Sequence, residues 1–123
     1  MKIILVIGIG SCIGGIFRYL LSQLIQNKFL SAFPFGTMTV NIIGCFLIGV
    51  VFAFSERGNF TMEWRLFLAT GLLGGFTTFS SFSLETVSLL RGGQLWHAFI
   101  YILCSIVIGL LATFAGIFLI KLL

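Results

Sequence analysis

Four long apolar segments constrain the fold of this chain more than any other feature of its sequence. They cover about residues 3–25, 34–55, 65–90 and 95–120, and each is long enough to cross the roughly 30 Å hydrocarbon core of a bilayer as a helix. A soluble domain of 123 residues, 59% of them hydrophobic and only 8% charged, could not bury so much apolar surface. We therefore predict an all-α integral membrane protein with a single transmembrane domain over residues 1–123.

The first segment raises two questions of its own. Its apolar run continues past Gly10-Ser11-Cys12 to Leu21, which is longer than the core of a typical signal peptide, so we expect an uncleaved span. Arg18 lies inside this span, where a cation is costly. Its side chain could reach the nearer interface, or it could form an electropositive entrance for an anion. The residues alone favour neither interpretation.

The third segment contains a stretch, Gly71 to Glu85, that is unsuited to a continuous helix. Gly74 and Gly75 are adjacent, and each costs roughly 1 kcal/mol in a helix relative to alanine. A run of hydroxyl side chains follows them: Thr77, Thr78, Ser80, Ser81 and Ser83. Irregular backbone persists at membrane depth only where it is buried in protein or lines a wet cavity. We predict a break at residues 74–77 and a polar solute handled beside it.

The polar side chains within the spans indicate a permeation lining rather than an active site. The chain has no Asp and one His, and it lacks a nucleophile with a base at recognisable spacing, so we predict that it is not an enzyme. Its three cysteines match no metal-site spacing and are interpreted as small packing residues. The expected lining consists of Thr37, Asn41, the Thr/Ser run including Ser80 and Ser83, Glu85, Tyr101 and Ser105. For Asn41 the alternative is an interhelical hydrogen bond.

Two phenylalanines, Phe79 and Phe82, stand out among the 15 in the chain. They are three residues apart and so share one helical face. An aromatic ring has a positive edge, and ring edges could coordinate a small anion weakly, as conduction requires. The alternative is that they are lipid-facing or core residues, like most phenylalanines of this chain.

The basic residues suggest how the chain sits in a membrane. The formal charge of +4 comes from scattered Lys and Arg, a pattern typical of membrane flanks and not of nucleic-acid binding. Four of them flank the side of the termini and two flank the other side: Lys2, Arg57, Arg65 and Lys121 against Lys28 and Arg91. So small a difference leaves insertion in both orientations open.

Three motifs, taken in order, cover nearly the whole chain. They are Gly14-Gly15-x-x-Arg18-Tyr19, Pro34-Phe35-Gly36-Thr37-x-x-Val40-Asn41-x-x-Gly44 and Gly71-x-x-Gly74-Gly75-x-Thr77-Thr78-Phe79-Ser80-x-Phe82-Ser83-x-Glu85. Together with the length and the four-span layout, these motifs resemble the Fluc/CrcB family of fluoride channels. Ser81, where a Thr is common, is a mild departure.

The resemblance implies a homodimer of two oppositely inserted subunits in the cell's inner (plasma) membrane. Two pores along the dimer interface would export fluoride passively and relieve its toxicity. The implied fluoride-pore residues are Phe79 and Phe82 as the coordinating aromatics, Asn41 as an amide donor, and Thr37, Ser80, Ser83, Glu85, Tyr101 and Ser105 along the track. The resemblance places Arg18 at an aqueous vestibule. It also implies a structural Na⁺ at the dimer centre, held by the backbone carbonyls of Gly74 and Thr77.

Two other functions are compatible with a small four-span chain. A multidrug-type proton-coupled exporter would need a carboxylate in its first span, and residues 3–25 contain none. A packing subunit of a larger membrane complex would explain small-residue spacings such as Gly10 and Gly14. It would not explain the Thr/Ser/Phe run.

Overall fold

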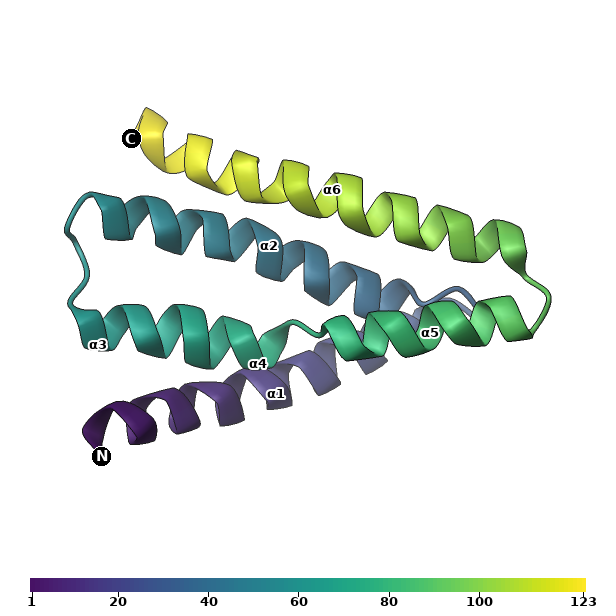
Figure 1. Cartoon of the computed structure of the whole chain (residues 1–123), viewed down its shortest axis with the longest axis horizontal. Helices are drawn as coiled ribbons and strands as arrows, with labels where there is room; N and C mark the ends of the chain where they lie inside the picture. The colour runs from purple at the N-terminus through teal and green to yellow at the C-terminus, as the bar shows by residue number, and fades with distance from the viewer.

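The computed structural model describes residues 1–123 and is entirely helical (Figure 1). Three helices are continuous: α1 (Lys2–Lys28), α2 (Phe35–Glu56) and α6 (Leu95–Leu122). The third span runs from Met62 to Arg91 in four pieces, namely α3 (Met62–Arg65), the π-helical η1 (Leu66–Leu73), α4 (Gly74–Phe76) and α5 (Phe79–Arg91). All four spans are long and apolar enough to cross a membrane, so the predicted all-α architecture with a broken third helix is confirmed.

The position of the break differs from the prediction. Gly74 and Gly75 remain helical within α4, and the backbone is extended at Thr77 (φ −95°, ψ 157°) and Thr78 (φ −151°, ψ 112°). Gly75 serves close approach instead, because a Cβ atom there would crowd the backbone of Ser11 on α1. β-Branched threonines favour extended backbone, so the break lies one step later than the glycines indicate.

Two closely packed helix pairs form the body of the molecule. α2 packs against α6, and α1 packs against η1 of the third span. In Figure 1, α2 lies between α6 and the third span, and α1 crosses the third span with both termini at one end. Glycines allow the helices to approach: a Cβ atom at Gly14 would overlap the Leu72 carbonyl of η1, and one at Gly116 would overlap the Phe46 carbonyl of α2. Thr113 Oγ1 also donates to the Cys45 carbonyl at 3.0 Å.

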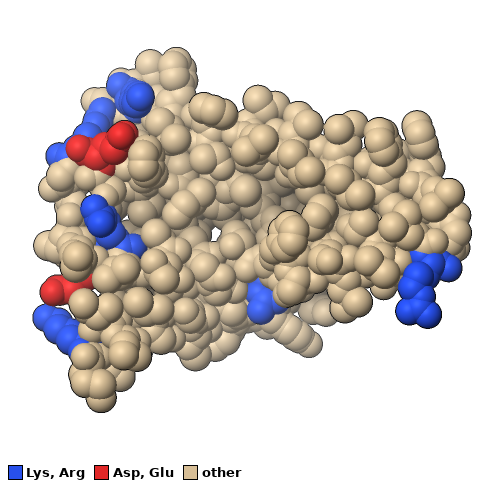
Figure 2. Space-filling model, in the orientation of Figure 1, with Lys and Arg blue, Asp and Glu red and all other residues tan.

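Few residues are buried, and the main buried cluster lies at the end opposite the termini. Only 19 of the 123 residues are buried, so most apolar side chains must face lipid or a second protein surface. The principal cluster comprises Phe33, Leu89, Ala98 and Tyr101. Charged side chains visible in Figure 2 gather mainly at the two ends, as expected when the middle lies in hydrocarbon.

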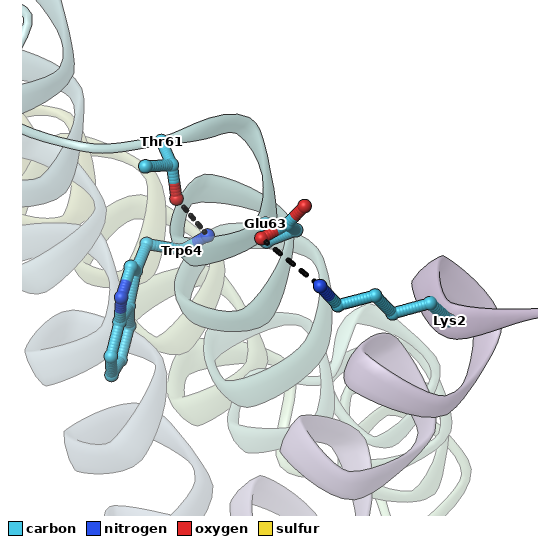
Figure 3. A network of polar contacts seen from close by, with 4 residues as sticks. All are labelled: Lys2, Thr61, Glu63 and Trp64. Atoms are coloured by element: carbon cyan, nitrogen blue, oxygen red, sulfur yellow. Dashed lines mark hydrogen bonds and ion pairs between the residues drawn. The ribbon is translucent and has the colours of Figure 1, made fainter.

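A helix cap and an exposed ion pair lie at the start of the third span, at the end that carries the termini. The hydroxyl of Thr61 accepts a hydrogen bond from the Trp64 amide at 3.3 Å and caps α3 (Figure 3). Lys2 Nζ lies 3.8 Å from Glu63 Oε2. Both side chains are exposed, so this ion pair contributes little to stability.

Candidate functional site

The break in the third span is held open by one side chain of α2. Asn41 Oδ1 accepts from the Thr78 amide at 2.8 Å, and Asn41 Nδ2 donates to the Thr78 carbonyl at 3.0 Å. The Thr78 hydroxyl then accepts from the Ser81 amide at 3.1 Å and caps α5. These bonds replace the helical ones that Thr78 gives up, which satisfies its backbone inside the membrane.

The diverted hydrogen bonds leave two carbonyl oxygens free at the break. Because the Thr78 amide donates to Asn41, it does not reach the Gly74 carbonyl four residues earlier. The Ser81 amide likewise donates to the Thr78 hydroxyl, and no hydrogen bond of the chain reaches the Thr77 carbonyl. The Gly75 carbonyl between them accepts from Arg18 Nε at 3.0 Å.

An open hollow of about 390 Å³ surrounds this break, and we call it the break hollow. Six of the residues predicted for the pore or the cation site line it: Asn41, Gly74, Thr77, Phe79, Phe82 and Ser105. The remainder of its lining is mainly apolar. Ser105 lines the hollow, and its hydroxyl is buried without a hydrogen-bond partner in the chain.

Phe79 and Phe82 stand in contact on α5, with ring centroids 5.6 Å apart. Phe79 is 80% exposed, whereas Phe82 is partly buried against Tyr101 at a centroid separation of 5.1 Å. The pair therefore has one ring anchored in its own chain and one ring presented outward. An outward aromatic ring in the middle of a span faces either lipid or another chain.

A second hollow, of about 290 Å³, lies at the end opposite the termini, and we call it the loop-end hollow. Thr37 and Glu85 line it together, and Thr37 Oγ1 donates to Glu85 Oε2 at 3.0 Å. The Tyr101 hydroxyl lies near the Glu85 carboxylate, yet neither Tyr101 Oη nor Glu85 Oε1 has a hydrogen-bond partner. Tyr101 also contacts Phe82, so it links the loop-end hollow to the aromatic pair.

The remaining predicted residues lie outside both hollows. Ser80 and Ser83 are exposed on α5, and the Ser80 hydroxyl lies 3.3 Å from the Thr78 hydroxyl. Arg18 lies on α1 and contacts the break through the Gly75 carbonyl. No group of three or more His, Cys, Asp or Glu residues is placed to hold a metal ion.

Comparison with known families decides the assignment. A family described as "CrcB-like protein, Camphor Resistance (CrcB)" matches residues 5–117. The chain belongs to the CrcB family. The matched residues include the break, the aromatic pair and the predicted residues that line the two hollows.

Curated relatives of this CrcB chain extend over nearly its whole length. A Parabacteroides distasonis protein named "Fluoride-specific ion channel FluC" is 47% identical over 119 residues, covering 97% of this chain and 92% of that protein. Proteins of the same name from Leptospira interrogans (46% identical; 98% and 95% covered) and Thermus thermophilus (44% identical; 94% and 93% covered) are similar to it. These relatives are named as ion channels and not as enzymes, in agreement with the prediction of a non-enzymatic protein.

Two residues of the CrcB site escaped prediction in their actual roles. Thr78 belongs to the hydroxyl run, but its backbone, held by Asn41, is the pivot of the break. Threonine is a favoured N-cap residue, and Thr78 caps α5, so this preference could have identified it. Gln26 is not among the predicted site residues, although its amide makes three hydrogen bonds to the backbone beside the loop-end hollow.

Proposed function

We propose that this chain is a fluoride-selective channel that exports fluoride passively across the cell's inner (plasma) membrane and so relieves fluoride toxicity. One observation carries the proposal. An aromatic pair, with Phe82 anchored in the chain and Phe79 facing outward, stands beside a membrane break whose hollow has no charged side chain in its lining. The names of relatives more than 40% identical over almost the full chain support fluoride as the ion.

We propose further that the conducting unit is an antiparallel homodimer with two pores along its interface. Both hollows are open on the surface of the single chain, and Phe79 is 80% exposed. One chain therefore supplies one wall of a path and not an enclosed pore. The small difference in flanking Lys and Arg, four at one end and two at the other, is compatible with insertion in both orientations.

In this proposal the anion moves past weak, successive partners. The ring edges of Phe79 and Phe82 offer positive electrostatic potential without a cation that would trap the ion. The second Nδ2 hydrogen of Asn41 offers a donor at the break hollow, and a rotation of the Ser105 side chain, whose buried hydroxyl has no partner, would offer another. Tyr101, Thr37 and Glu85 continue the track to the loop-end hollow, with Ser80 and Ser83 exposed alongside on α5. The Arg18 guanidinium, which donates to the Gly75 carbonyl at the break, contributes positive potential to the aqueous vestibule that we propose on that side of α1.

A structural Na⁺ at the dimer centre fits the residues at the break. The Gly74 and Thr77 carbonyls accept no hydrogen bond from the chain, and hard cations bind such oxygen ligands. We propose that these two oxygens hold Na⁺ together with the same two oxygens of a second copy. When bound, the ion would neutralise the carbonyl dipoles that the break leaves unpaired.

Efflux from liposomes that contain only this protein tests the function. Purified protein in vesicles loaded with fluoride should release it when the membrane potential is clamped with a K⁺ ionophore, whereas chloride-loaded vesicles should retain their anion. If the vesicles release neither ion and the protein purifies from cells with constant partners, the chain is a subunit of a larger complex and the channel proposal is wrong.

Removal of Na⁺ should impair the channel. In vesicles prepared with N-methylglucamine in place of Na⁺, we expect fluoride efflux to fall at least about tenfold, because about 1.4 kcal/mol of lost ion binding shifts a population tenfold. Restoring Na⁺ should restore the flux, and elution volume in detergent would report whether the dimer separates. Equal fluoride efflux with and without Na⁺ would contradict the cation site and leave the channel function standing.

A further inference from the structure

The side-chain amide of Gln26, near the C-terminal end of α1, makes hydrogen bonds to the connection between α1 and α2. Gln26 Nε2 donates to the Ser31 carbonyl at 3.1 Å and to the Phe33 carbonyl at 3.0 Å. Gln26 Oε1 accepts from the Gly36 amide at 3.0 Å. One side chain thus holds backbone groups on both sides of Pro34, two in the loop and one in the first turn of α2.

Both ends of the loop lead to the proposed anion track. Phe33 packs edge-on against Tyr101 at a centroid separation of 5.6 Å, and Tyr101 in turn contacts Phe82 at 5.1 Å. Gly36 directly precedes Thr37, whose hydroxyl donates to Glu85. The position of the loop therefore sets both the aromatic contact and the polar contact that border the loop-end hollow.

The approach of the helices leaves the loop little freedom to compensate for a lost bond. A Cβ atom at Gly36 would overlap the Ser22 carbonyl of α1, so α1 and α2 touch backbone to backbone at this point. Gln23 and Gln26 both line the loop-end hollow, but the Gln23 amide makes no hydrogen bond to the loop. The two glutamines therefore differ in geometry although they share a residue type and a hollow.

We infer that Gln26 is a positioning residue for ion conduction. Its three bonds hold the backbone beside the loop-end hollow in place. They thereby position the Thr37–Glu85 hydrogen bond and the aromatic contacts of Tyr101 with Phe33 and Phe82. The inference rests on the proposed function, since it concerns the passage of fluoride through this end of the track. It gives Gln26 a role in the throughput of each channel and not only in the stability of the helical bundle.

A matched set of variants tests this inference in fluoride efflux from liposomes at low protein density. Gln26→Met keeps the length of the side chain and removes the amide, and Gln23→Met does the same at the neighbouring position. Gln26→Asn keeps an amide in the hollow but is one methylene shorter. The fraction of vesicles that empty counts the active channels, and the rate constant of efflux in those vesicles reports the throughput of each channel.

We expect Gln26→Met and Gln26→Asn to lower the rate per active channel by on the order of tenfold, about what the net loss of one or two hydrogen bonds amounts to. Gln23→Met should stay within about twofold of the wild type on the same scale. If the Gln26 variants lose only active vesicles and keep the wild-type rate per channel, the amide serves folding alone and the inference is wrong. If Gln23→Met slows efflux as much, the rate depends on the polarity of the loop-end hollow and not on the three bonds of Gln26, and positioning is excluded. A wild-type protein that conducts no fluoride overturns the proposed function instead.

Discussion

Replacing Phe79 or Phe82 with isoleucine is expected to cut fluoride efflux sharply while the protein keeps its oligomeric state. The positive ring edge is an attractive partner for the anion in a hollow that has no charged side chain in its lining. The loss of either ring should therefore reduce the efflux rate by more than about tenfold, which corresponds to about 1.4 kcal/mol. Isoleucine preserves apolar bulk but offers no positive ring edge. The measurement is the efflux rate constant in liposomes, together with the elution volume in detergent.

The two positions differ in what else they support. Phe82 packs against Tyr101, so its replacement also removes a contact within the chain. Phe79 is 80% exposed, which makes Phe79→Ile the cleaner probe of the ion contact. Phe17→Ile is a matched control, because Phe17 is 58% exposed on α1 and lines neither hollow. Unchanged efflux in both Phe79→Ile and Phe82→Ile would sink the aromatic mechanism.

The sequence is sufficient for the four spans because the bilayer restricts the possible structures so strongly. A segment that crosses hydrocarbon must satisfy its own backbone, so a long apolar run with few charges predicts a helix and its approximate ends. The broken third helix is also predictable, since adjacent glycines followed by a hydroxyl run disfavour a continuous helix. These predictions depend on local composition alone.

The location of the break and the partners of the polar residues depend on contacts distant in sequence. Gly75 stays helical because it packs against Ser11 of α1, and Thr78 leaves the helix because Asn41, 37 residues earlier, takes both of its backbone groups. The sequence places Thr37 and Glu85 on one polar track, but only the packing of α2 against α5 shows that they share a hydrogen bond. The three bonds of Gln26 depend in the same way on the path of a loop that contains no regular pattern.

Asn41→Leu is expected to destabilise the protein as well as stop conduction. The variant leaves the Thr78 amide and carbonyl without their partners, and each unsatisfied buried backbone group costs about 1–3 kcal/mol. In a membrane no water can replace the lost bonds at depth, so the extended geometry at Thr77 and Thr78 should not persist. We expect an earlier thermal transition in detergent and fluoride efflux below about a tenth of the wild-type rate.

Thr39→Val is the control for this substitution. Thr39 lies on α2 two residues from Asn41, and its hydroxyl makes no hydrogen bond to the third span, so the change removes a polar group without touching the break. Wild-type stability and flux are expected for it, within about 0.5 kcal/mol. If Asn41→Leu keeps the wild-type thermal transition but loses efflux, the amide serves the ion and does not hold the break. If Asn41→Leu keeps both, Asn41 has neither role, and the free Gly74 and Thr77 carbonyls must owe their geometry to the threonines themselves.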